Sequence, residues 1–272
     1  LLLSNINLLL LSILMRSISN AEIDLIQTLF QRYGSLRKVA VLCNRSPATI
    51  KKYVSDKALI VRKNIVSTVS HNEILKGLYI GLWMGDGTQY YNQAYEIKIC
   101  SNKRQRELNS FIQRIILDLF GKKTYLIEDK NTNRAYIKFR SKFIFEWIEN
   151  YVSYSSNKTK TIRLLGSHQN YDPLFRDGLL LGLCLSDGYL KGLFKFNVIS
   201  KNLSCLVIDL LKLYGYQPSQ YVHDRSRWGW HDLYMVSLNK LESQELNFLL
   251  DSILIQLDCK MPFKVLKNGP DV

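Results

Sequence analysis

The sequence predicts an α+β protein with two similar halves of order αββαββα, preceded by a small all-α unit. Three observations predict this fold class. The segment GLYIGLWMGDGT at residues 77–88 recurs as GLLLGLCLSDGY at residues 178–189. Downstream of both segments, the hydrophobic period changes between the strand and helix values in the same order. Ahead of the first segment, three short helical patterns lie within residues 20–57.

The first half is expected at residues 73–165, and its hydrophobic patterns predict the order of its helices and strands. An apolar helix ends near residue 86, and the alternating stretch at 95–101 predicts a strand that completes a hairpin. Residues 102–121 have the period of an amphipathic helix. A second hairpin is predicted at 123–141, and the helical segment 143–152 closes the half.

The second half, expected at residues 174–272 after a linker at 166–173, repeats these patterns. The alternating stretch 193–200 predicts a strand, and 201–215 an amphipathic helix. A longer hairpin is predicted at 219–239, and a closing helix at 246–257. We therefore expect two structurally related halves in one chain.

Small residues recur at every fourth position of both repeated helices. A glycine inside a helix costs ~1 kcal/mol relative to alanine, so three in register need a compensating role. Small residues let two helix backbones approach closely, and we expect these two helices to pack together. The predicted interface residues are Gly77, Gly81 and Gly85 in the first helix, and Gly178, Gly182 and Ser186 in the second.

An aspartate follows each small-residue stripe, and the predicted packing brings Asp86 and Asp187 together. Both carboxylates would lie at the negative end of a helix dipole and would repel each other. A divalent cation removes this conflict, and Mg²⁺ prefers oxygen ligands. The alternative is that each Asp-Gly pair only forms a turn after a helix.

The segments YIGLWMGDG at 79–87 and LLGLCLSDG at 180–188 resemble the two signature helices of the LAGLIDADG homing endonucleases. The resemblance covers roughly residues 73–265. It implies a single-chain, monomeric, intron-encoded enzyme with two halves related by a pseudo-two-fold axis. Such an enzyme makes a staggered double-strand break in a long, asymmetric DNA target. Met84 and Leu185 replace the acid at the sixth letter of the family motif.

The resemblance also implies the catalytic and metal-binding residues. Asp86 and Asp187 would be the catalytic carboxylates, and Gly85 and Ser186, which precede them, would complete a metal site for Mg²⁺, with Mn²⁺ or Ca²⁺ able to occupy it. A basic residue after the last helix of each half would stabilise phosphate charge. Its best matches by position are Lys158 and Lys260, with Lys160 and Lys264 as neighbours. The alternative for each lysine is a solvated surface position.

The charge balance favours nucleic acid as the partner. The 37 Lys and Arg residues exceed the 23 Asp and Glu residues, and the net charge of +14 is spread along the chain. Alternation in the strands puts polar groups on one sheet face, which could contact double-stranded DNA. The predicted DNA-binding residues are Lys98, Arg134, Lys138 and Arg140 in the first half, and Lys195, Asn197, Arg225 and Arg227 in the second.

Two features of this surface stay open. Trp228 and Trp230, in the loop that carries the two arginines, are interpreted as packing against the sheet edge, as aromatic rings usually do. The pattern near residue 233 does not decide which side chains face outward.

The N-terminal patterns resemble a helix-turn-helix at residues 20–57, joined by a linker at 58–72. Ser35 and Ser46 are good helix caps, and Pro47 suits a first helical position. Thr49, Lys51 and Lys52 would face DNA from the last helix. The expected core residues are Val39, Ala40, Leu42, Ile50 and Val54. A helical packing unit without DNA contact is the alternative.

Residues 1–19 are expected to form a disordered leader. Their apolar run at 1–14 is shorter than the ~20 residues that span a bilayer, so no membrane partner is expected. The five cysteines show neither disulfide nor zinc spacing, which indicates an intracellular protein. Besides a Mg²⁺-dependent endonuclease, the sequence leaves open a maturase that binds intron RNA and a DNA-binding regulator that retains the fold.

Overall fold

The computed structural model describes residues 18–33, 35–54, 69–91 and 94–268. It divides the chain into two compact units, residues 1–67 and 68–272. Nearly all of the expected leader and most of the expected linker lie outside the described residues. Among the described residues, no helix has both the length and the apolar character that crossing a membrane requires.

The first unit contains three helices, α2 (Asn20–Tyr33), α3 (Leu36–Leu42) and α4 (Pro47–Tyr53). The Ser35 and Ser46 hydroxyls accept hydrogen bonds from backbone N–H groups of the first turns of α3 and α4, which fixes where these helices begin. The helices pack around six buried residues: Ile26, Phe30, Val39, Ala40, Ile50 and Val54.

One core expectation for this unit is wrong. Leu42 is 53% exposed, because it ends the short helix α3 on the side away from the core. The core is completed instead by Ile26 and Phe30 of α2, which the sequence analysis did not assign.

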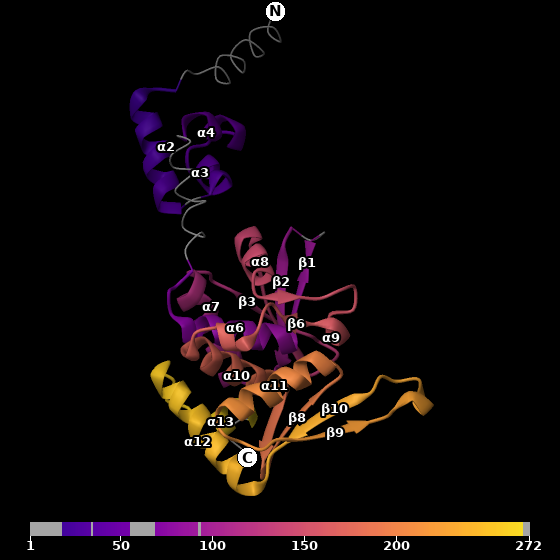
Figure 1. The fold of residues 1–272 in the computed structure, drawn as a ribbon. Coiled ribbons are helices and arrows are strands. Elements are labelled where there is room, and N and C mark those ends of the chain that lie inside the picture. The colour runs from indigo at the N-terminus through magenta and orange to yellow at the C-terminus, as the bar shows by residue number, and fades with distance from the viewer. Residues whose placement is uncertain (1–17, 34, 55–68, 92–93, 269–272) are drawn as a thin grey trace, which may run out of the picture. The chain divides into compact units, whose positions relative to one another are not determined.

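The second unit contains α and β elements with antiparallel sheets, as predicted, and the order αββαββα occurs twice (Figure 1). The elements of the first half are α6 (Glu73–Asp86), β1 (Gly87–Tyr90), β2 (Glu96–Asn102), α7 (Arg106–Phe120), β3 (Tyr125–Glu128), β4 (Arg134–Arg140) and α8 (Lys142–Glu149). The connecting segment holds β5 (Val152–Ser153), α9 (Lys158–Thr161), β6 (Arg163–Leu164) and the short 3₁₀ helix η2 (His168–Asn170).

The second half repeats the same order and adds a helix at its end. Its elements are α10 (Pro173–Asp187), β7 (Gly188–Lys191), β8 (Leu193–Val198), α11 (Lys201–Leu213), β9 (Ser219–His223), η3 (Ser226–Trp228), β10 (Leu233–Ser237), α12 (Lys240–Gln256) and α13 (Phe263–Asn268). The helix α13 was not expected from the sequence.

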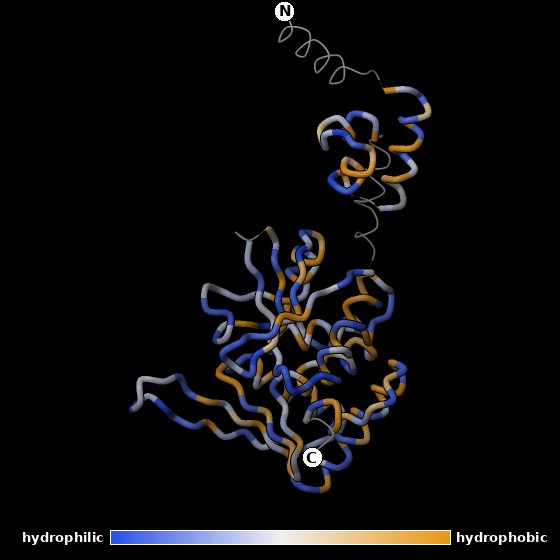
Figure 2. Tube along the Cα trace, turned by 180° about the vertical axis from the view of Figure 1, so that it is seen from behind, coloured by the Kyte–Doolittle hydropathy of each residue, from blue (hydrophilic) through white to orange (hydrophobic). Residues whose placement is uncertain are grey.

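The two sheets have matching strand orders, β1-β2-β4-β3 and β7-β8-β10-β9. In both sheets the glycine after the paired helix begins the edge strand, with Gly87 opposite Ile99 and Gly188 opposite Phe196, while the connection within the first hairpin is longer. Hydrophobic residues gather in the interior of the unit, while the β9–β10 hairpin extends away from it (Figure 2). The register resolves the open pattern in β10: Val236 is buried opposite Phe196, so Met235 and Ser237 face outward.

The helices α6 and α10 pack with their backbones in direct contact. A Cβ added to Gly81 would lie 2.5 Å from the Leu179 carbonyl oxygen, and one on Gly182 would lie 2.3 Å from that of Leu78. Gly77 and Gly178 are equally close to the facing backbone. Only glycine leaves room for this approach, so the stripe determines how the two halves meet.

Candidate functional site

The paired helices bring their acidic ends together. Asp86 is the last residue of α6 and Asp187 the last of α10, and each is followed by a glycine that begins a strand. A Cβ on Gly85 would lie 2.1 Å from the Ser186 Oγ and 2.5 Å from the Asp187 Oδ2. The close approach therefore continues to the helix ends and places both carboxylates in one region.

The electrostatics of the two carboxylates reflect this crowding. Burial raises the pKa of Asp86 to about 7, and the charge of Asp187 adds to the shift, while Lys267 and Lys158 oppose it. Burial also raises the pKa of Asp187 above its usual range, against the same two lysines. A group that stabilises the charged forms, such as a cation, is therefore favoured here.

Two buried lysines close the ends of the paired helices. The Lys158 Nζ donates hydrogen bonds of 2.9 Å to the carbonyl oxygens of Trp83 and Met84. The Lys267 Nζ donates to the carbonyl oxygens of Leu185 and Ser186. Lys158 thus shares the Trp83 carbonyl with the Gly87 N–H group and adds a donor for that of Met84. Both lysines lie at the carboxyl ends of the helices and interact favourably with the helix dipoles.

Burial lowers the pKa of both ammonium groups, while the charges of Asp86 and Asp187 oppose the shift. The pKa of Lys158 falls to about 8. The site therefore contains two carboxyl groups with raised pKa values and two lysines with lowered ones. Such opposed shifts are typical of functional sites.

Lys260 does not occupy the position that the sequence analysis assigned to it. It is exposed and lines a separate pocket with Glu107 and Asp258. Lys267 of α13 fills the position that matches Lys158, because the chain turns after α12 and returns to the end of α10. The neighbouring residues Lys160 and Lys264 are exposed.

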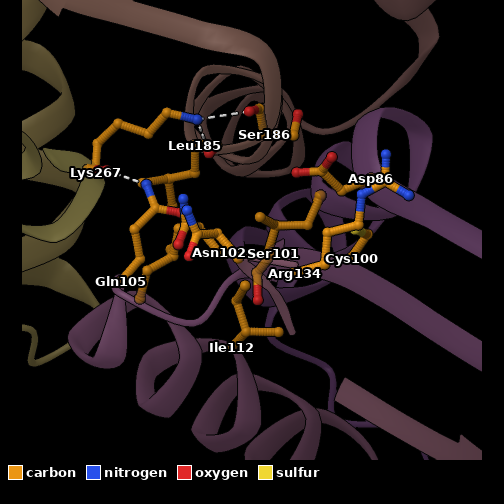
Figure 3. Close-up of a pocket in the computed structure, with 13 residues that line it drawn as sticks. Asp86, Cys100, Ser101, Asn102, Gln105, Ile112, Arg134, Leu185, Ser186 and Lys267 are labelled. Carbon is orange, nitrogen blue, oxygen red and sulfur yellow. Dashed lines mark hydrogen bonds between the residues drawn. The ribbon is translucent and has the colours of Figure 1, made fainter. Parts of the chain in front are cut away.

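A pocket of about 260 Å³ opens beside Asp86 (Figure 3). Lys267 and Ser186 line it from the second half, and Arg134 and Gln105 from the first. The Gln105 side chain donates a hydrogen bond to the Lys267 carbonyl oxygen, which ties α13 to the start of α7. Arg134, predicted to contact DNA, therefore lies close to the carboxylate site rather than on a remote part of the sheet.

The other predicted DNA-binding residues lie on the outward sheet faces and on the long hairpin. Lys98, Lys138 and Arg140 share one face of the first sheet, opposite the buried Ile97, Ile99, Ile137 and Phe139. Lys195 and Asn197 are exposed on the second sheet, where β8 alternates exposed and buried positions. In the first unit, Lys51 and Lys52 are exposed, and Thr49 hydrogen-bonds to Ser46.

The interpretation of the two loop tryptophans is confirmed in part for Trp228, whose ring makes an edge contact with the His223 ring at the end of β9, and is wrong for Trp230. Trp228 is 48% exposed and Trp230 is 64% exposed, because both lie at the hairpin tip beyond the sheet. The Arg227 guanidinium lies 3.9 Å from the centre of the Trp228 ring, and that of Arg225 lies 5.6 Å from the Trp230 ring. The arginines and tryptophans therefore form one exposed surface.

The donor set at the helix ends fits a hard divalent cation. The side chains that converge there are carboxylates, whose oxygens such a cation prefers. The Gly85 and Ser186 carbonyl oxygens lie at the same helix ends and are already in contact with the Lys158 and Lys267 ammonium groups. No group of three or more His, Cys, Asp or Glu side chains with metal-binding geometry occurs in the part of the chain that the structure describes. A cation here would therefore rely on two carboxylates, main-chain oxygens, water and phosphate.

Comparison with known proteins defines the fold. No family model matches the sequence. The ATP-dependent DNA helicase Hel308 of Thermococcus kodakarensis is 26% identical over 147 residues, which cover 52% of this chain and 13% of the helicase. The chain thus spans only a small part of that curated relative.

Solved structures of homing endonucleases share the architecture. Variants of I-DmoI match with a TM-score of 0.50 at 14% identity, covering 67% of this chain and 93% of theirs. I-WcaI bound to its DNA recognition sequence matches with a TM-score of 0.51 at 13% identity, covering 78% of this chain and 92% of its own. At these identities the likeness establishes the fold alone, which is that of LAGLIDADG homing endonucleases.

Proposed function

We propose that this chain is a site-specific DNA endonuclease of the homing type, which makes a metal-dependent, staggered double-strand break in a long, asymmetric target. One observation carries the proposal. Two carboxylates, Asp86 and Asp187, meet at the ends of helices whose glycines permit backbone contact, between two sheets with polar outward faces. A turn at a single Asp-Gly pair does not account for this convergence.

Asp86 and Asp187 would hold Mg²⁺, and Mn²⁺ or Ca²⁺ could take the same place. The carbonyl oxygens of Gly85 and Ser186 would join them only through their second lone pairs, because the Lys158 and Lys267 ammonium groups already contact these oxygens. The bound ion would neutralise phosphate charge and lower the pKa of a bound water. Lys158 and Lys267 keep positive charge at the helix ends, where it would stabilise a phosphate that gains charge during cleavage. With a pKa of about 8, the Lys158 Nζ can also exchange a proton with water near neutral pH.

The two sheets would lie along the DNA major groove, related by a pseudo-two-fold axis, so that one monomer contacts both half-sites. Their outward lysines, arginines and asparagine suit phosphates and base edges. The first unit would act as a helix-turn-helix, with Lys51 and Lys52 of α4 extending the contact. Each carboxylate would serve the cleavage of one strand.

The exposed surface at the tip of the β9–β10 hairpin favours a second candidate, a maturase that binds its intron RNA. Trp228 and Trp230 are half-exposed or more and lie beside arginines, an arrangement that stacks on unpaired bases. A maturase can retain both carboxylates. A regulator that only binds DNA would gain nothing from two aspartates facing phosphates, so we favour it less.

Cleavage of duplex DNA that spans the insertion site of the gene tests the proposal. We expect a double-strand break with a fixed stagger in Mg²⁺, mapped by sequencing the ends, and none in EDTA. Asp86→Asn and Asp187→Asn should abolish it, whereas Lys260→Met, a change away from the site, should retain it. Tight binding to intron RNA without cleavage of DNA in either Mg²⁺ or Mn²⁺ would support the maturase instead.

A further inference from the structure

A buried carboxylate lies within the predicted DNA-binding face of the first sheet. Glu96 begins β2, and its side chain is 0% exposed although the face around it is polar. Its Oε1 lies 2.9 Å from the Lys98 Nζ, and its Oε2 lies 2.7 Å from the Lys138 Nζ and 3.4 Å from an Arg140 nitrogen. Three of the cations predicted to contact DNA therefore share one anion.

Strand register explains why the carboxylate is there. Lys98 lies directly opposite Lys138 across β2 and β4, and Glu96 lies opposite Arg140 on the same face. Two lysines facing each other repel, and an acid beside them relieves the repulsion. Burial acts to raise the pKa of Glu96, but the ammonium groups of Lys138 and Lys98 beside it outweigh this effect, and the pKa lies below its usual range. Glu96 is therefore ionised under ordinary conditions.

The cations remain accessible while their positions are restricted. The side chains of Lys98 and Lys138 are 25% and 30% exposed, and that of Arg140 is 61% exposed. The Lys98 Nζ also lies 4.7 Å from the centre of the Tyr90 ring. A lysine held in this way has already lost much of the side-chain freedom that a free surface lysine keeps.

The second sheet provides an internal comparison. When the two sheets are matched at Gly87 and Gly188, Lys195 corresponds to Lys98, Ser237 to Lys138 and Leu193 to Glu96. Lys195 is exposed and forms no ion pair within the described residues. The two halves thus differ at two of these three positions: the first sheet has a second lysine and an acid that restrains both, and the second has neither.

We propose that Glu96 is a positioning residue that determines sequence specificity in the first half-site. It holds Lys98 and Lys138 where they can reach base edges, and it offsets their attraction to any phosphate. This inference rests on the proposed DNA-binding function. A free cluster of three cations would instead bind phosphates without regard to sequence, because phosphate contacts position a protein but do not read bases.

The test compares the wild type with Glu96→Gln, which removes the charge at nearly constant shape. With a random-sequence duplex as probe, the slope of log affinity against log salt should become steeper by about 1, as expected for one more phosphate contact. In selections from a duplex library, base preference should fall about 10-fold in the half-site of the first sheet and persist in the other. Lys195→Met is the matched control, and it should weaken binding without changing preference in the first half-site.

A second variant of Glu96 separates the effect of the position of the carboxylate from the effect of its charge. It also keeps the inference testable if Glu96→Gln does not fold. Glu96→Asp keeps the anion but withdraws it from the lysines, so we expect a wild-type salt slope with reduced preference in the first half-site. A lower melting temperature with unchanged preference in both variants would make Glu96 a purely structural residue and overturn the inference. If the wild type binds no duplex DNA, the proposed function itself fails. If the wild type binds duplex DNA and both Glu96 variants keep its base preference, only the role of Glu96 fails.

Discussion

Replacing Gly81 by alanine tests whether the small-residue stripe holds the two halves together. The new Cβ would lie 2.5 Å from the Leu179 carbonyl oxygen and 2.8 Å from the Leu183 nitrogen, whereas ordinary contact begins at 3.4 Å. Both neighbouring atoms belong to the backbone and cannot rotate away. The helices α6 and α10 must therefore separate by about 1 Å along a buried interface.

The energetic consequence can be estimated from three effects. Overpacking of a core costs ~1–3 kcal/mol, and a rigid backbone neighbour puts this site at the upper end. A gap of ~0.5–1 Å elsewhere in the interface also loses a quarter to a half of the dispersion energy there. The higher helix propensity of alanine returns ~1 kcal/mol. We expect a net destabilisation of about 2–3 kcal/mol, which lowers the melting temperature by roughly 5–10 °C in a unit of this size.

Thermal unfolding followed by circular dichroism provides the measurement, with Gly121→Ala as control. Gly121 has φ +63° and no atom within 4 Å of an added Cβ, so its replacement tests backbone conformation without a clash. Helix propensity alone predicts that Gly81→Ala is the milder change. A Gly81→Ala protein as stable as the wild type would refute the close-packing argument.

Three further predictions concern the charged site and the hairpin tip. In EDTA, the melting temperature should fall as the pH rises from about 4 to about 7 and level off above that, because the pKa of Asp86 is raised from 3.8 to about 7 on folding and the folded state binds the extra proton only in this range. Asp86→Asn should flatten that profile, and a flat wild-type profile would contradict the reasoning. Lys267→Met should remove about 2 kcal/mol of stability measured by urea unfolding, since it leaves helix-end carbonyls without their charged donor, whereas Lys260→Met should remove none. Replacing Trp228 and Trp230 by alanine should change stability by less than ~0.5 kcal/mol yet weaken nucleic-acid binding in filter assays; a large loss of stability would mean that the rings pack on the fold.

Local patterns predicted most of the fold. The order of helices and strands follows from hydrophobic periods, and the starts of α3 and α4 follow from Ser35 and Ser46, whose side chains bind N–H groups three residues ahead. The repeat carried the long-range information, because two glycine stripes in matching positions indicate helices that touch. Such features are readable because each depends on residues close in sequence or on a repeated segment.

What the sequence did not reveal depends on contacts between distant segments. Lys267 acts on carbonyls of α10 that lie about 80 residues earlier, and only the turn after α12 brings it there. Strand alternation puts Glu96 on the polar face of β2, and its burial requires Lys138 and Arg140 from a different hairpin. Leu42 and Trp230 were misassigned for the converse reason, since apolar side chains are not buried where no second element covers them.

The balance of charge at the helix ends connects these observations. Two carboxylates and two helix ends together carry about three negative charges, because each helix end contributes roughly half a charge. Lys158 and Lys267 supply two positive charges directly at those ends. The remaining negative charge is small enough for the metal-free protein to fold, and the raised pKa of Asp86 reduces it further. A bound divalent cation would reverse the sign of the site, so that a phosphate becomes a favourable neighbour. The lysines therefore do more than bind the carbonyls at two helix ends. Because they offset most of the negative charge there, one divalent cation would suffice to make the site positive, so that metal binding would favour phosphate binding and phosphate binding would favour metal binding.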